Sequence, residues 1–192
     1  MRKITRPECP NPRALSKDYK NAENKKVLLS ASNNKCMYCE SYVTHISYGD
    51  VEHIRPKSRY PDLEFTWGNL GIVCSICNNT KSDKFDESTQ YINPYQDDPE
   101  DHILASGALL LHKQGSERGQ LTILEIGLNR VALIEKRFEK INRIQNAIDA
   151  AMRTPNNTLK QLAIIEILNE SESNQEFSLC IKQLLKSHGI ID

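Results

Sequence analysis

Four of the six cysteines stand in two Cys-x2-Cys pairs, and this arrangement constrains the fold more than any other feature of the 192-residue chain. The pairs are Cys36 with Cys39 and Cys74 with Cys77, and 34 residues separate them. Each pair can place two thiolates on one ion within a tight turn, so two such knuckles predict a closed, structural zinc site with four sulfur ligands. The alternatives are two redox-active pairs or thiols that are simply packed.

The composition fits a cytoplasmic globular protein and argues against a membrane protein. Hydrophobic residues make up 39% of the chain, and no apolar run approaches the roughly 20 residues of a membrane span. The start, MRKITRPECP, lacks the apolar core of a signal peptide. In the reducing cytoplasm, paired cysteines are more often metal ligands than disulfides. Cys9 and Cys180 stand alone and are expected to be buried or idle thiols.

The pattern of apolar and turn-forming residues predicts a mixed α+β fold. We expect helices over residues 130–153, 157–169 and 174–188, with Asn129 capping the first of them. Apolar runs at 107–113 and 120–126 predict a small β-hairpin. Around the cysteine pairs we expect an arm at 1–12, a helix at 13–31, a turn at Asn33-Asn34, strands at 50–55 and 69–74, and a helix at 75–85.

The chain is expected to fall into two parts. Residues 1–95 would form the zinc-stabilised core with its N-terminal arm and helix, and residues 96–192 the hairpin and a C-terminal helical region. The second part either completes the same compact unit or extends it for partner docking. Residues 1–85 carry 14 Lys and Arg against 9 Asp and Glu, whereas residues 86–192 carry 11 against 16. The basic front half predicts contact with a polyanion, and chance unevenness is the plainer alternative.

The segment DVEHIRPK, at residues 50–57 between the cysteine pairs, places Glu52 beside His53, and Asn69 and Asn78 follow. Phosphodiester hydrolysis needs an activated water and a cation that stabilises the developing charge. The His53 imidazole can take a proton near neutral pH, and Glu52 and Asn78 offer the oxygen ligands that suit Mg²⁺ or Mn²⁺. Each residue alone fits a structural role; their order within the cysteine clamp favours a nuclease site.

This pattern, EH…N…CxxCNxxK, resembles the HNH endonuclease superfamily with its ββα-metal core, as a variant with Asn in the third position. The resemblance implies that His53 is the general base, that Glu52 and Asn78 hold the catalytic metal, and that Asn69 ties the site together by hydrogen bonds. Basic side chains that could reach a substrate phosphate are Lys81, one helical turn beyond Asn78, together with Arg55 and Lys57.

One local difficulty concerns the neighbouring pair Glu52 and His53. Adjacent residues on a regular strand point to opposite faces, so the two cannot line one site unless the strand bends or the side chains turn round its end. We expect a distortion here, with Pro56 ending the strand. The histidines at positions 45, 102, 112 and 188 have no comparable surroundings and are expected to be ordinary.

The resemblance extends to MRKITR, INPYQDDPEDHI and LTILEIGLNRVALIEKR, which are similar to the PtuB-like HNH proteins of Septu-type and retron-associated anti-phage systems. It implies a PtuA-like partner, an ABC/SMC-like ATPase that restrains or licenses cleavage. In retrons it would add a reverse transcriptase and its RNA–DNA product. The acidic back half and the C-terminal helices would be docking surface or would only complete the fold.

These observations predict a metal-dependent endonuclease that hydrolyses nucleic-acid phosphodiester bonds in phage defence, with DNA as the expected target and RNA such as tRNA as the other. The main rival is a zinc-knuckle module that binds nucleic acid or a partner without cutting. Glu52, His53 and Asn78 distinguish the two, because a binder does not need them. A redox protein is the third possibility.

Overall fold

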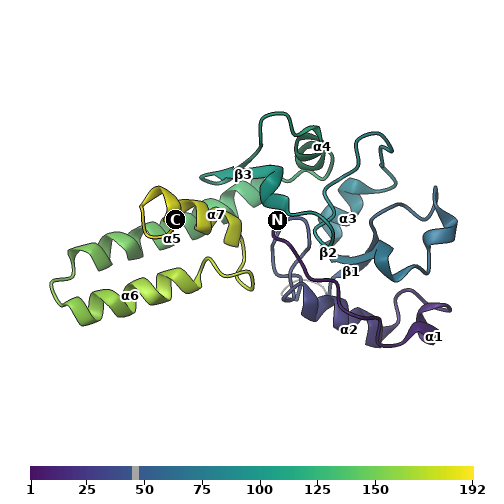
Figure 1. The fold of residues 1–192 in the computed structure, drawn as a ribbon, viewed down its shortest axis with the longest axis horizontal. Helices are drawn as coiled ribbons and strands as arrows, with labels where there is room; N and C mark the ends of the chain where they lie inside the picture. The colour runs from purple at the N-terminus through teal and green to yellow at the C-terminus, as the bar shows by residue number, and fades with distance from the viewer. Residues whose placement is uncertain (45–47) are drawn as a thin grey trace.

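The fold is described from a computed structural model for residues 1–44 and 48–192 (Figure 1). It is a mixed α+β structure, as predicted. In chain order its elements are α1 (Pro12–Leu15), α2 (Ala22–Ala31), β1 (Asp50–His53), the 3-10 turns η1 (Pro61–Leu63) and η2 (Trp67–Asn69), β2 (Leu70–Val73), α3 (Ser75–Lys81), η3 (Pro99–Asp101), β3 (Ile103–Ser106), β4 (Leu109–His112), α4 (Glu117–Glu125), α5 (Val131–Arg153), α6 (Asn157–Asn169) and α7 (Ser178–Ser187).

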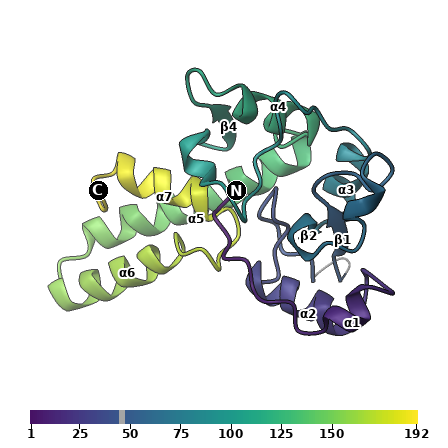
Figure 2. The same ribbon diagram turned by 45° about the vertical axis from the view of Figure 1, so that its right-hand side comes forward.

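The predicted strand, loop, strand and helix are present as β1, β2 and α3. β1 and β2 pair antiparallel, with Glu52 opposite Gly71 and His53 opposite Leu70. The register is regular up to His53, where β1 ends, so no bulge interrupts the pairing at the expected distortion. α2 lies on one side of this hairpin and α3 on the other (Figures 1 and 2). The loop between the strands contains the two short 3-10 turns, and the antiparallel pairing of β1 and β2 brings its ends together.

The N-terminal helix predicted over 13–31 is broken in the middle. α1 ends at Leu15, and α2 begins at Ala22 after the cap residue Asn21, whose side chain accepts hydrogen bonds from the first turn. The intervening residues form turns, and Asp18 accepts a hydrogen bond from the Lys20 backbone N–H at 2.8 Å. Asp and Asn compete for backbone hydrogen bonds in this way, which is why they interrupt a helical pattern.

The second hairpin is real, but the sequence pattern misplaced it. β3 and β4 pair antiparallel and turn at Gly107, whose φ of +58° is a left-handed conformation that glycine adopts at no steric cost. The apolar run 120–126, predicted as a strand, lies mostly in helix α4. Ser116 caps that helix by accepting from the Gly119 N–H at 3.0 Å. A short apolar run fits a buried helix as well as a strand, and here the cap decides.

The C-terminal helices α5, α6 and α7 lie close to their predicted positions, but Asn129 is not a helix cap. Its side chain instead bonds both the N–H and the C=O of Leu110, fastening β4 to the start of α5. α5 packs against α6 and α7, and a second apolar cluster fills the space between them. α6 and α7 lie at the end of the molecule away from β1 and β2 (Figure 2).

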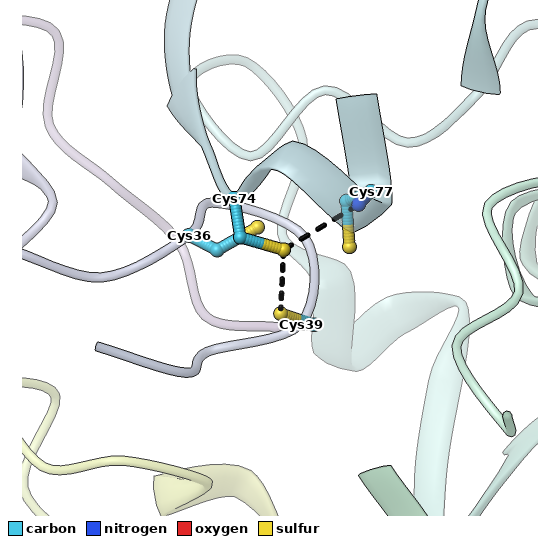
Figure 3. Close-up of side chains that lie close together, drawn as sticks. All are labelled: Cys36, Cys39, Cys74 and Cys77. Carbon is cyan, nitrogen blue, oxygen red and sulfur yellow. Dashed lines mark hydrogen bonds between the residues drawn. The ribbon is translucent and has the colours of Figure 1, made fainter. Parts of the chain in front are cut away.

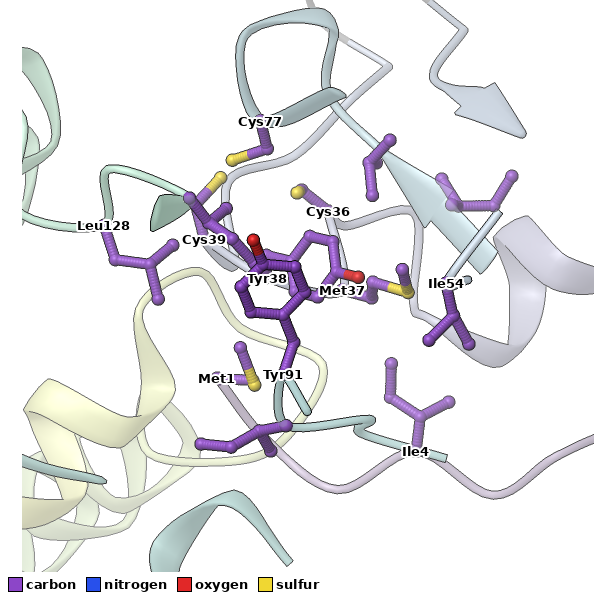
Figure 4. Close-up of a cluster of buried hydrophobic side chains, with 14 of the residues drawn as sticks. Met1, Ile4, Cys36, Met37, Tyr38, Cys39, Ile54, Cys77, Tyr91 and Leu128 are labelled. Atoms are coloured by element: carbon purple, nitrogen blue, oxygen red, sulfur yellow. The ribbon is translucent and has the colours of Figure 1, made fainter. Parts of the chain in front are cut away.

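The main core joins the two predicted parts of the chain. It extends from Met1 through the cysteine knuckles to Cys180, with the fully buried Tyr38 among Met1, Tyr91 and Leu128 (Figure 4). The N-terminal ammonium pairs with the buried Glu40 carboxylate at 3.0 Å, and Ser178 donates to the same carboxylate. The main core therefore contains residues from both sides of the predicted boundary at residue 95. In residues 1–44 and 48–192 no helix is long and apolar enough to cross a membrane.

Candidate active site and metal centre

The four paired cysteines come together in space, as their spacing predicts. Their sulfur atoms all lie within 4.8 Å of one another, and Cys39 Sγ is 3.8 Å from Cys74 Sγ (Figure 3). Three of the four side chains are buried. This set of four soft sulfur donors at one point fits a tetrahedral ion such as zinc, and it leaves no position for a substrate. It is a candidate structural metal site.

Local backbone geometry builds the two knuckles. Asn33 and Asn34 adopt left-handed φ angles that turn the chain from α2 into the first knuckle, as the predicted turn requires. There Glu40, also left-handed, donates its N–H to the Cys36 carbonyl at 3.0 Å. The knuckle packs on β2 at Gly71, where an added Cβ would press on the Met37 thioether and make that side chain shift. The absence of a side chain here lets the knuckle approach the strand closely.

The second knuckle lies at the junction of β2 and α3. Cys74 caps the helix, and its sulfur accepts from the Cys77 N–H at 3.4 Å. Arg130, just before α5, adds a charge that the sequence did not reveal. Its guanidinium lies 3.5 Å from Cys77 Sγ and 3.9 Å from Cys74 Sγ. A cation here stabilises thiolates, the form in which cysteine binds metal.

Three of the four candidate catalytic residues, Glu52, His53 and Asn78, line a cleft of about 460 Å³ along β1, whereas Asn69 borders a separate hollow. The cleft lining includes Asp50, Glu52, His53 and Asn78 from the ββα core. Among the described residues, β2 is the only strand paired with β1, so the other edge of β1 has no strand partner. Side chains on opposite faces of a strand can both reach its open edge. Glu52 and His53 therefore share one cleft without a bend in the strand.

His53 is held as a neutral imidazole. Its Nε2 lies 2.9 Å from the Glu64 carbonyl oxygen, which can only accept, so Nε2 carries the proton and Nδ1 is left to accept one. Burial lowers the pKa of His53 below its ordinary value of 6.5, and the Glu64 carbonyl opposes this only in part. The Tyr19 ring packs edge-on against the imidazole with centroids 4.6 Å apart. This arrangement suits a general base at neutral pH.

Glu52 forms a buried ion pair with Lys81. Lys81 is fully buried and donates to Glu52 Oε1 at 2.6 Å and to the His53 carbonyl at 3.0 Å. Burial raises the pKa of Glu52, and the Lys81 charge opposes that rise. The phosphate contact predicted for Lys81 is not supported by this placement, because its ammonium is already engaged beneath the cleft.

Asn78 is joined by a residue that the sequence reasoning missed. Its side-chain Nδ2 donates to Asp50 Oδ2 at 3.1 Å, and both residues line the cleft. Asp50 lies two residues before Glu52, and the two-residue period of a strand puts both carboxylates on one face. That period was the available signal. Asp50, Glu52 and Asn78 thus give the cleft two carboxylates and one amide from the ββα core, the kind of oxygen donors that Mg²⁺ and Mn²⁺ prefer, and Asp83 after α3 adds a third carboxylate to the lining.

Asn69 fastens the loop between the strands. Its amide accepts from the Arg55 N–H at 2.8 Å and donates to the carbonyls of Arg55 and Leu63 at 3.0 and 3.3 Å. The next residue after Leu63 is Glu64, whose carbonyl holds His53. Asn69 therefore acts on the imidazole through the loop, and no hydrogen bond joins the two side chains among the described residues.

The two remaining basic candidates lie in different places. Lys57 lines the cleft and pairs with Glu64 at 2.8 Å. Arg55 borders a separate hollow, where its guanidinium lies 5.6 Å from the Tyr60 ring centroid and 5.5 Å from that of Phe85. The structure thus places one of the three predicted phosphate contacts in the cleft. The cleft also contains Tyr19, Lys20 and Lys25 from the N-terminal segment, which were not predicted.

His102, His112 and His188 lie apart from the cleft lining. His102 and His188 bond Ser116 and Gln145, and the His112 imidazole lies by the Lys113 carbonyl. His45 falls outside the described residues. Cys180 is buried in the core and Cys9 is half-buried, as free thiols.

Comparison with known proteins agrees with this geometry. Residues 36–84, which contain both knuckles and the cleft residues of the ββα core, match the HNH endonuclease family. The chain is 29% identical over 175 residues to Septu protein PtuB of Bacillus thuringiensis, covering 84% of this chain and 67% of that protein. It is 30% identical over 158 residues to Septu protein PtuB of Bacillus mycoides (strain KBAB4), covering 66% and 54%. Residues 36–84 thus match an HNH domain, and the chain is similar to these PtuB proteins, of which it spans about half to two thirds.

Proposed function

We propose that this PtuB-like chain is a metal-dependent HNH endonuclease that hydrolyses phosphodiester bonds of nucleic acid. The observation that carries the proposal is the joint presence, in one cleft, of an imidazole whose Nδ1 has no hydrogen bond within the described part of the chain and a group of oxygen donors. A protein that only binds nucleic acid has no need for either. The match of residues 36–84 to the HNH endonuclease family supports the same reaction class.

In this proposal His53 takes the proton of the attacking water at Nδ1, while the Glu64 carbonyl fixes the ring through Nε2. Glu52, Asn78 and Asp50 would hold the catalytic cation, Mg²⁺ or Mn²⁺, which supplies charge stabilisation for the phosphate and the leaving oxygen. Lys81 neutralises Glu52 from beneath and fixes the end of β1 through the His53 carbonyl. Asn69 holds the loop that carries Glu64.

We assign zinc to the four-cysteine centre as a structural ion. The donor set is all sulfur and the sulfurs are largely enclosed, which fits zinc better than the oxygen-preferring Mg²⁺. The site joins the first knuckle to the start of α3, which carries Asn78 and Lys81. Zinc would therefore hold α3 against β1. None of the six cysteines is in a disulfide, and a reducing cytoplasm would keep the paired ones available as zinc ligands.

We further propose that the chain is an effector of anti-phage defence that works with a PtuA-like ABC/SMC ATPase. The likeness to two Septu proteins named PtuB supports this role. DNA is the first candidate substrate, and RNA such as tRNA is the second. A retron context, with a reverse transcriptase and its RNA–DNA, stays a prediction from the wider resemblance.

The proposal is tested by titrating Mg²⁺ and Mn²⁺ into the zinc-loaded protein with plasmid DNA, or a tRNA pool, alone and with a PtuA-like ATPase. We expect strand cleavage that depends on the divalent ion. Nucleic-acid binding without cleavage at any ion concentration, with the ATPase present, would instead identify the rival binding module. A redox protein would be favoured if metal analysis found no zinc and a thiol assay found the paired cysteines in disulfides.

A further inference from the structure

We propose that the N-terminal segment forms a second, basic wall of the cleft, in which Lys20 and Lys25 bind the phosphate backbone of the nucleic acid on one side of the cut. This inference rests on the proposed nuclease function and extends it to residues outside the matched domain, which begins at residue 36. Both lysines line the same cleft as His53.

The wall touches the catalytic residue through Tyr19. The tyrosine ring lies against the His53 imidazole at 4.6 Å, with Lys20 Nζ 5.5 Å and Lys57 Nζ 4.7 Å from its centroid. Ammonium groups from two separate segments thus gather around one ring beside the general base. A phosphate that enters the cleft meets them next to the atom that activates water.

Charge is distributed across the cleft in a way that suits a bound strand. The carboxylates of Asp50 and Glu52 lie on the β1 side, where a divalent cation would be held. Lys57 is already paired with Glu64, at 2.8 Å. Lys20 and Lys25 form no ion pair within the described part of the chain, so their charge is available to a phosphate. Lysine ammonium groups bind backbone phosphates by charge, without reading sequence.

The wall is preorganised, because the arm before it is fixed to the core and the segment is closed by its own hydrogen bonds. The Arg6 guanidinium donates to the carbonyls of Trp67, Gly68 and Leu70, and the Trp67 indole donates to the Pro7 carbonyl at 2.8 Å. Within the segment, the buried Asn24 of α2 exchanges two hydrogen bonds of 3.0 Å with the Asn11 backbone.

The segment also contains its own control. Lys17 and Lys26 are exposed, carry the same charge within the same segment and do not line the cleft. Lys17 lies in the turn before α2 and Lys26 within α2, and both represent ordinary solvated lysines. If basic charge alone attracted nucleic acid, the pair Lys17 and Lys26 would matter as much as the pair Lys20 and Lys25.

The test compares K20A/K25A with K17A/K26A in the full zinc-loaded chain that also carries H53A, which removes cleavage. Binding is followed by fluorescence anisotropy of a short labelled DNA duplex and of a matched RNA, over about 50–200 mM salt. We expect K20A/K25A to weaken binding roughly tenfold or more and to lower the log–log salt slope by about two. K17A/K26A should stay within about twofold of the parent, and the stronger-binding probe identifies the source of the phosphate.

Equal effects of the two double variants, or no effect of K20A/K25A, would overturn the inference. The nuclease proposal would still stand if the chain with His53 intact cleaves the same probe. If the H53A parent binds neither probe and the chain with His53 intact cleaves neither, with a PtuA-like ATPase added, both proposals fail. Zinc content and circular dichroism of each variant establish that it is folded.

Discussion

Replacing Lys81 by Met should destabilise the protein strongly, because it leaves a buried carboxylate without its counter-charge. The Lys81 side chain is 0% exposed and that of Glu52 only 10%, and the two are 2.6 Å apart. Removing one partner of such a pair costs roughly 3–5 kcal/mol. Lys84→Met is the matched control, since the Lys84–Glu125 pair is 49% and 38% exposed and should contribute about 1 kcal/mol at most.

The assay is urea unfolding of the zinc-loaded protein without added magnesium. The double variant E52Q/K81M should recover a large part of the loss, because it removes the unpaired charge. Burial already raises the pKa of Glu52, and the loss of Lys81 would raise it further. The folded variant then binds a proton more readily than the unfolded chain, so its deficit should shrink as the pH falls towards the carboxyl range. A deficit below about 1 kcal/mol, or additive effects in the double variant, would refute the buried pair.

Three further predictions concern the metal centre, the base and the loop. Cys77→Ser should abolish the zinc found by metal analysis and lower the urea midpoint, whereas Cys9→Ser should leave the zinc in place; equal zinc in both would contradict the four-sulfur site. Since burial lowers the pKa of His53, cleavage should persist below pH 6.5 and be lost only as the pH drops through that lowered pKa. A cleavage rate that already falls above pH 6.5 as the pH is lowered would argue against His53 as the base. Asn69→Ala should lower the free energy of unfolding by about 1–3 kcal/mol and reduce the cleavage rate at saturating metal. An unchanged cleavage rate in a folded variant would show that the loop does not contribute to catalysis.

The sequence predicted the ββα core because its signals are local and redundant. The cysteine spacing, the Asn33-Asn34 turn and the apolar strands all favour the same arrangement, and each is present. Residues 120–126 were misassigned because a short apolar run has no decisive period, and the cap at Ser116 lies outside it. Asn129 has the right residue type for a helix cap but satisfies the β4 backbone instead.

The site was predictable in its residue types and less so in its contacts. Lys81 has the helical spacing from Asn78 that suits a phosphate contact, yet burial turns it towards Glu52. Depth below the surface depends on packing of distant segments, which spacing does not encode. The same holds for Lys20 and Lys25, which reach the cleft only because the N-terminal arm is fixed across the η2 turn and α2.

The most direct test of the account is cleavage by zinc-loaded His53→Ala beside the wild type, in the Mg²⁺ or Mn²⁺ condition where the wild type cuts. Loss of a general base should lower the rate by roughly 10²–10⁴-fold, with zinc content and the urea midpoint little changed. A zinc-loaded variant that cuts as fast as the wild type would contradict the assignment of His53, and with it the proposed active site along β1.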